Sequence, residues 1–135
     1  MRNLVSLLFV SGFFLVLGGP SVLAHHSFTA EFDVNKPVQV TGNITKVEWI
    51  NPHSWIYVDA KKPDGTTENW AFEAGTPNTL LRRGLKKTDL PAGTKVTIFG
   101  YQSRDGGARA NAANLTLADG RALFLGSGSP NEQPK

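Results

Sequence analysis

The chain contains no cysteine, and its only methionine is Met1. Without cysteine no disulfide can form, even in an oxidising compartment, so the stability of the fold must come from its core. Sulfur ligands are also absent from everything that follows Met1, which excludes a copper(I) site built on thiolate or thioether groups. Any metal site must therefore use nitrogen and oxygen ligands.

The chain also lacks a strong charge of either sign. Its 14 Lys and Arg residues against 11 Asp and Glu residues give a net charge of +3. The basic residues are scattered rather than interleaved with aromatic ones, so no nucleic-acid partner is expected. Catalytic signatures are missing as well: no serine has the context of a nucleophile elbow, and Gly106-Gly107 is typical of a turn rather than a phosphate loop. We therefore do not expect an enzyme.

The first 24 residues have the pattern of a secretory signal peptide. Arg2 precedes an apolar run over residues 4–17, residues 18–20 (Gly-Gly-Pro) break any helix, and the sequence Ser-Val-Leu-Ala ends at Ala24. This order predicts cleavage after Ala24 and a mature chain that begins at His25. The alternative is a retained membrane helix, which needs roughly 20 apolar residues. The run is shorter, so we expect a periplasmic or secreted protein with no membrane span after cleavage.

The rest of the chain is predicted to be mainly β. Apolar residues alternate from Val38 onwards, which is typical of a half-buried strand, and Pro63-Asp64-Gly65 is a strong turn signal. Further strands are expected over residues 53–60, 67–74, 94–102 and 109–117, with a last hairpin strand over 121–125. The period changes to a helical one after Thr76-Pro77, which resembles an N-cap followed by proline at the first helical position, and Gly84 can end that helix.

Three strands, a short helix and two more strands follow one another in the order of an OB-fold. We therefore predict a small OB-like five-stranded barrel over residues 38–125, with one short helix between the third and fourth strands. An open antiparallel sheet or a small sandwich is the alternative. Residues 25–37 are expected to form an extended N-terminal arm and residues 126–135 a disordered tail.

The chain has three histidines, and their positions suggest a metal site. His25 and His26 are the first two residues of the predicted mature chain, and His53 follows Asn51-Pro52 at a predicted bend. The free α-amine and the Nδ1 of a terminal histidine can chelate one ion together, because an α-amine with a pKa near 7.7–8.0 is partly neutral at neutral pH. His53 or His26 would supply a further nitrogen, which gives a histidine-brace arrangement suited to copper(II) and less well to zinc. Glu31, Asp33 or Tyr57 could add an oxygen ligand.

A simpler interpretation of the same residues is also open. Two histidines at a chain end can form an ordinary solvated terminus, and His53 can be a strand-end histidine bonded to a backbone carbonyl. The brace also depends on cleavage at one particular bond. The function predicted here is thus that of a small secreted binding protein, monomeric and metal-binding through His25, His26 and His53.

Aromatic residues provide the alternative function. Several of them come from the first three predicted strands, and that face of an OB-fold often binds ligands. A barrel of this size needs large core residues, so most of these rings are expected inside. The protein could thus be a non-metal accessory module that engages a periplasmic protein or a small ligand. The residues on which such a site would depend are Trp49, Asn51, Trp55, Tyr57 and Trp70.

Six short segments of the chain form a distinctive set: Ala24-His25-His26-Ser27-Phe28, Glu31-Phe32-Asp33, Val47-Glu48-Trp49 followed by Asn51-Pro52-His53, Asn69-Trp70-Ala71-Phe72-Glu73, Leu80-Leu81-Arg82-Arg83-Gly84 and Arg109-Ala110-Asn111-Ala112. Together these segments resemble the family of small exported bacterial proteins catalogued as domain of unknown function 6152. The resemblance extends over essentially the whole mature chain and includes all three histidines. It implies a secreted, β-rich single domain and brings no established activity or ligand.

Overall fold

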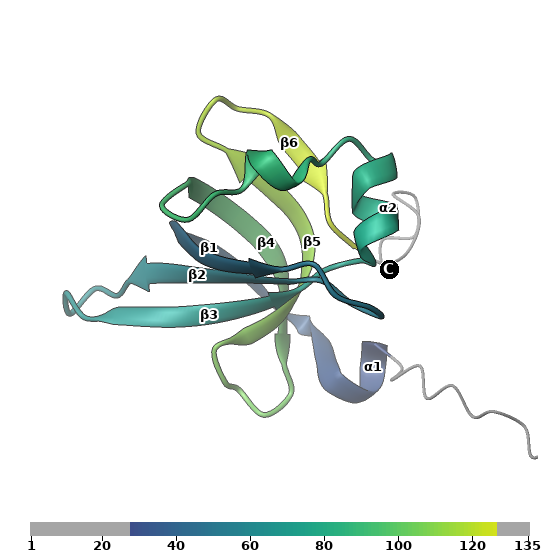
Figure 1. Ribbon diagram of the computed structural model, residues 1–135. Helices are drawn as coiled ribbons and strands as arrows, with labels where there is room; N and C mark the ends of the chain where they lie inside the picture. The colour runs from purple at the N-terminus through teal and green to yellow at the C-terminus, as the bar shows by residue number, and fades with distance from the viewer. Residues whose placement is uncertain (1–27, 127–135) are drawn as a thin grey trace, which may run out of the picture.

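The computed structural model describes residues 28–126 (Figure 1). The predicted signal peptide, His25 and His26, and residues 127–135 of the predicted tail lie outside these residues. In chain order the elements are α1 (Phe28–Glu31), β1 (Phe32–Glu48), β2 (Trp55–Lys61), β3 (Thr67–Glu73), α2 (Pro77–Arg82), the 3-10 turn η1 (Lys87–Asp89), β4 (Lys95–Ser103), β5 (Arg109–Leu117) and β6 (Ala122–Phe124). Among residues 28–126, no helix has the length and apolarity that crossing a membrane requires.

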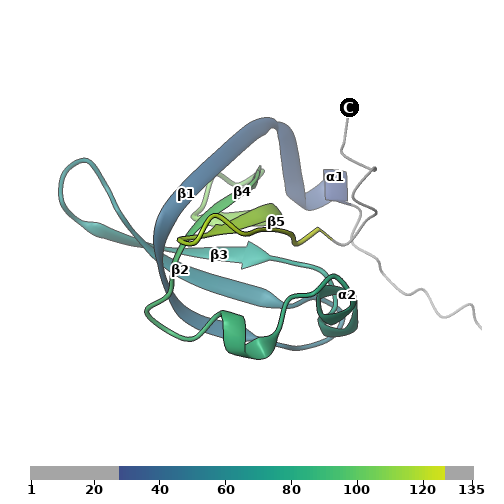
Figure 2. The same ribbon diagram turned by 90° about the horizontal axis from the view of Figure 1, so that it is seen from above.

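The strands form one six-stranded sheet that nearly closes into a barrel. Its order is β3-β2-β1-β4-β5-β6, and an additional pairing between β3 and β5 completes a ring through five strands. That closing pair is parallel and short, joining Ala71, Phe72 and Glu73 to Arg109, Ala110 and Asn111, whereas the other pairs are antiparallel. The long β1 is strongly curved and forms one wall of the ring, as Figure 2 shows. This confirms the prediction of a mainly β, OB-like five-stranded ring with a short helix between β3 and β4.

The predicted alternation of side chains sets which face of each strand is inside. In β2, Ile56 and Val58 are buried, whereas Trp55 and Tyr57 on the opposite face are partly exposed. Phe72 is buried and stacks against Trp70, with ring centroids 5.9 Å apart, as their shared face in β3 predicts. The inward residues of the five strands form one core, which α2 and the segments after it close with Leu80, Leu85 and Leu90.

The predicted helix is present and begins as its sequence indicates. The Thr76 hydroxyl accepts a hydrogen bond from the backbone N–H of Thr79 at 3.2 Å, and Pro77 occupies the first helical position. Gly84 follows with a φ of +91°, a conformation that costs glycine little. Cap, proline and glycine thus determine where α2 starts and stops.

The N-terminal part of the barrel differs from the expected extended arm. Residues 28–31 form a single helical turn, and β1 begins at Phe32 rather than near Val38. Phe32 is only 2 % exposed and contacts the ring of Phe28, so burial of these rings orders a segment that shows no hydrophobic period. The expected hairpin strand at the C-terminal end is present as the short β6, which within residues 28–126 pairs only with β5. Gly126, assigned to the tail from sequence, is buried.

Candidate functional site

His53 lies in the short connection between β1 and β2. Trp49 and Ile50 leave the end of β1, the Asn51–Pro52 peptide bond is cis, and His53 and Ser54 then lead into β2. Two backbone hydrogen bonds tie this connection to the end of β3: Ser54 N–H donates to the Gly75 carbonyl at 3.1 Å, and Ala74 N–H donates to the Ser54 carbonyl at 2.8 Å. His53 is therefore held on a fixed backbone next to the last residue of β3.

That last residue, Glu73, meets the imidazole of His53. The Nδ1 atom of His53 lies 2.8 Å from Oε1 of Glu73, although the N–H and the carboxylate are not aligned for a straight hydrogen bond. Nδ1 is buried and has no hydrogen-bond partner among the described residues, whereas the side chain as a whole is 32 % exposed. The exposed part of the ring therefore belongs to its other atoms, and among these only Nε2 can bind a metal.

Beyond His53, outward side chains of β1 and β2 form a polar cluster around Tyr57. Tyr57 donates its hydroxyl hydrogen to Oε2 of Glu48 at 3.0 Å, and Lys46 donates to Oε1 of Glu48 at 2.7 Å. The hydrogen bond from Lys46, followed by that from Tyr57, lowers the pKa of Glu48 below its ordinary value. The same bond raises the pKa of Lys46, and desolvation raises the pKa of Tyr57. These groups satisfy one another and form no site with His53.

On the side of Glu73 away from β2, the neighbouring strands β5 and β4 connect it to the position of α1. Glu73 pairs in register with Asn111 of β5, and Asn111 pairs with Tyr101 of β4. Residues paired in this way point to the same face of the sheet. The ring of Phe28 packs edge-on against that of Tyr101, with centroids 5.9 Å apart. The start of the described chain thus lies on the same face as Glu73, two strands away.

Two arginines hold α1 in this position. Arg104 donates through Nε to the Thr29 carbonyl at 2.7 Å, and its backbone N–H donates to the Glu31 carbonyl at 2.9 Å. Nη1 of Arg109 lies 3.6 Å from Oε2 of Glu31, and the guanidinium lies over the ring of Phe32. In Figure 1, α1 lies beside the β4–β5 loop, away from α2.

Of the three predicted metal ligands, His53 is described and partly exposed, and His25 and His26 fall outside the described residues. The suggested oxygen ligands have other partners: Glu31 faces Arg109, Asp33 accepts the backbone N–H of Asn35, and Tyr57 is bonded to Glu48. Within residues 28–126, no three His, Cys, Asp or Glu side chains come together closely enough to hold a metal ion.

The aromatic residues divide between the core and the outer face. Trp49 and Trp70 are partly buried and pack against the core, and the ammonium of Lys87 lies 5.8 Å from the centre of the Trp49 ring. Trp55 and Tyr57 are outward and half-buried, and Asn51 is exposed. The residues of the weaker predicted ligand site thus do not share one surface.

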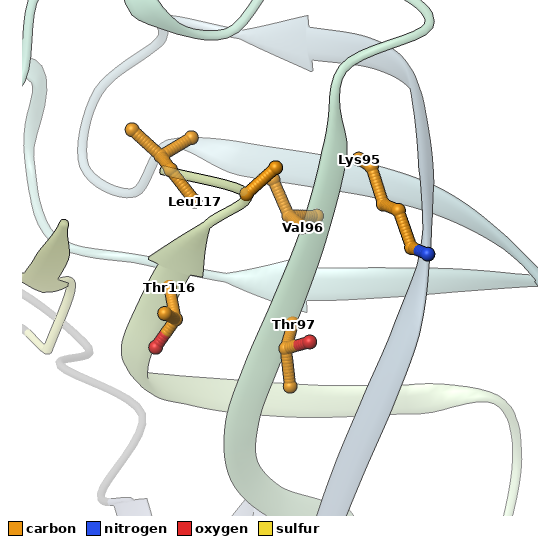
Figure 3. A pocket seen from close by; sticks show the side chains of 6 residues that line it. Lys95, Val96, Thr97, Thr116 and Leu117 are labelled. Carbon is orange, nitrogen blue, oxygen red and sulfur yellow. The ribbon is translucent and has the colours of Figure 1, made fainter. Parts of the chain in front are cut away.

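Shallow hollows occur elsewhere on the barrel. The one in Figure 3 has a volume of about 220 Å³ and lies between the end of β5 and the start of β4. A neighbouring hollow of about 440 Å³ contains Asp89 and Arg121, which contact each other through two bonds of 3.3 Å. Neither contains a histidine or an aromatic ring.

Glu73 is the residue that sequence reasoning missed. Its signal is the hairpin register: once the turn at Pro63-Asp64-Gly65 pairs Lys61 with Thr67, alternating residues place Glu73 opposite Trp55. His53, two residues before Trp55 on the same side, is then the diagonal neighbour of Glu73.

Residues 14–112 match the family of unknown function DUF6152, so the match includes His25, His26, His53 and Glu73. No curated protein and no solved structure matches the chain. Since the match extends over most of the 135 residues, the chain belongs to the family of unknown function DUF6152.

Proposed function

We propose that the mature protein binds a divalent metal, copper(II) in preference to zinc, in the periplasm or outside the cell. The terminal amine and the imidazole of His25 chelate the ion, and Nε2 of His53 completes a nitrogen site. Copper(II) favours such tetragonal nitrogen ligation and stands above zinc in the divalent affinity order. The observation that carries the proposal is that α1 is anchored on the face of the barrel that also carries His53 and Glu73.

The length of chain before Phe28 fits this site. Neighbouring strands lie about 4.8 Å apart, so the backbone of Tyr101 is about 10 Å from that of Glu73. Three residues separate the start of α1 from the predicted terminus, and three extended residues span at most about 10–11 Å. The segment before Phe28 is therefore comparable in length to the spacing of these strands, which supports a site shared by His25 and His53. His26, next in the chain, is the alternative source of the third nitrogen.

The test uses the protein with His25 as its first residue. Copper(II) and zinc(II) are titrated and followed by calorimetry and by Trp fluorescence, because a copper ion at His53 lies near Trp55 and should quench it. His53→Ala should weaken copper binding strongly, and one alanine added before His25 should do the same by converting the amine into an amide. No binding tighter than micromolar, or binding indifferent to both changes, would overturn the proposal.

A further inference from the structure

The contact between Glu73 and His53 lies in a rigid part of the barrel. Glu73 is the last residue of β3 and is paired on one side with Trp55 and on the other with Asn111. His53 directly precedes the residue whose N–H and carbonyl bond to Gly75 and Ala74. The relative position of the two side chains is thus set by backbone hydrogen bonds on both sides of the pair, before any ligand is present.

We propose that Glu73 is a positioning residue: it holds the proton of His53 on Nδ1 and so presents the Nε2 lone pair to the metal. This inference rests on the metal-binding function proposed above. A neutral imidazole carries one N–H and one lone pair, and a carboxylate can only accept. With Oε1 of Glu73 at 2.8 Å from Nδ1, the neutral ring places its proton there. Rotation about χ2, which has a broad minimum in histidine, would bring the N–H into line with the carboxylate.

The burial of the pair strengthens this effect. Nδ1 is shielded from water, and the side chain of Glu73 is only 13 % exposed. Water therefore competes poorly for the Nδ1 proton. A carboxylate behind a metal-bound histidine fixes the orientation of the ring and makes the ligating nitrogen more basic, and its loss typically costs 10–100-fold in metal affinity. The negative charge of Glu73 also offsets part of the charge of the ion.

Glu48 offers a matched control. It is the carboxylate on the other side of Trp55 in the same outward row, but it is bonded to Lys46 and Tyr57 rather than to His53. Glu48→Ala and Glu73→Ala therefore each remove a carboxylate from a residue that pairs directly with Trp55. Only the second change removes the carboxylate that lies 2.8 Å from Nδ1.

The experiment measures two properties in the protein that begins at His25. The first is copper(II) affinity in Glu73→Ala, Glu73→Gln, Glu48→Ala and His53→Ala, with thermal unfolding followed by circular dichroism to establish that each variant is folded. The second is the tautomer of His53 in the metal-free protein at a pH where the ring is neutral, read from its ¹⁵N chemical shifts and assigned with His53→Ala.

We expect Glu73→Ala to weaken copper binding about 10–100-fold and to release the proton from Nδ1. Glu73→Gln keeps an acceptor oxygen and should recover part of the loss, and Glu48→Ala should change neither property. If His53→Ala abolishes binding but Glu73→Ala leaves both affinity and tautomer unchanged, the role of Glu73 is overturned and the metal site stands. If His53→Ala itself has no effect, the proposed function fails.

Discussion

Gly42 lies where β1 changes partners, from β4 to β2. It pairs with Val96 of β4, and the next residue, Asn43, is in register with both Lys95 and Asp59. A Cβ at position 42 would lie 2.1 Å from the carbonyl oxygen of Asp59 and 2.8 Å from Val58. Glycine is therefore needed for the close approach of two backbones, although its φ is not of the left-handed kind.

Gly42→Ala should accordingly destabilise the barrel. The added methyl group must displace the backbone of β2, and overpacking of this kind costs about 1–3 kcal/mol of unfolding free energy. Urea denaturation of the variant measures the loss. Gln39→Ala, an exposed position on the same strand, is the control and should change the free energy of unfolding by less than about 0.5 kcal/mol. Equal stabilities of the two variants would contradict the packing described for β1.

Asp89 gives a prediction about pH. Its carboxylate accepts the backbone N–H of Lys86 at 2.9 Å and faces Arg121, and these bonds, the first above all, lower its pKa. A folded pKa below the unfolded value means that the stabilisation is complete above the unfolded pKa, about 3.9, and is lost as the pH falls through the folded one. Asp89→Asn should therefore unfold at a lower temperature than the unmodified protein at neutral pH, and the two melting temperatures should converge below about pH 4. If the two melting temperatures differ in acid by as much as they do at neutral pH, the ionised carboxylate of Asp89 is not the source of the difference.

At the scale of elements, α1 shows where sequence patterns stop being informative. Its four residues carry no helical period, and its conformation depends on contacts far along the chain, with Tyr101 and Arg104. α2 is the opposite case, because Thr76, Pro77 and Gly84 specify its start and its end locally. The β2–β3 hairpin was likewise predictable from its turn and its alternating residues.

The anchoring of α1 is testable through metal affinity. Arg104→Ala removes the bond from Nε to the Thr29 carbonyl, so α1 is held less firmly, and under the proposed function the effective concentration of His25 at His53 falls. We expect copper(II) affinity to drop severalfold while the melting temperature changes little, since Arg104 is exposed. Arg82→Ala, an exposed arginine on α2, is the control. Loss of affinity in both variants alike would argue against a local effect of α1.

At the scale of the whole molecule, the order of the strands and their closure into a ring were predictable from the resemblance to the order of an OB-fold, but the residues that close the ring were not. The order of five strands and one helix follows from local periods and turns. The parallel contact of Ala71–Glu73 with Arg109–Asn111 depends on how the sheet coils, which no local pattern encodes. That closure brings β4 and α1 within two strands of Glu73. The sequence therefore pointed to His53 directly and to Glu73 through the register of the hairpin, whereas the contact of α1 with Tyr101 had no signal in it.

The central claim is that the first residue of the mature chain and His53 bind one copper ion together. The most direct measurement is electron paramagnetic resonance of the copper(II)-loaded protein that begins at His25, compared with the same protein carrying His53→Ala. We predict nitrogen hyperfine couplings from the amine, from His25 and from His53, with the last absent in the variant. Identical spectra from the two proteins would contradict the claim.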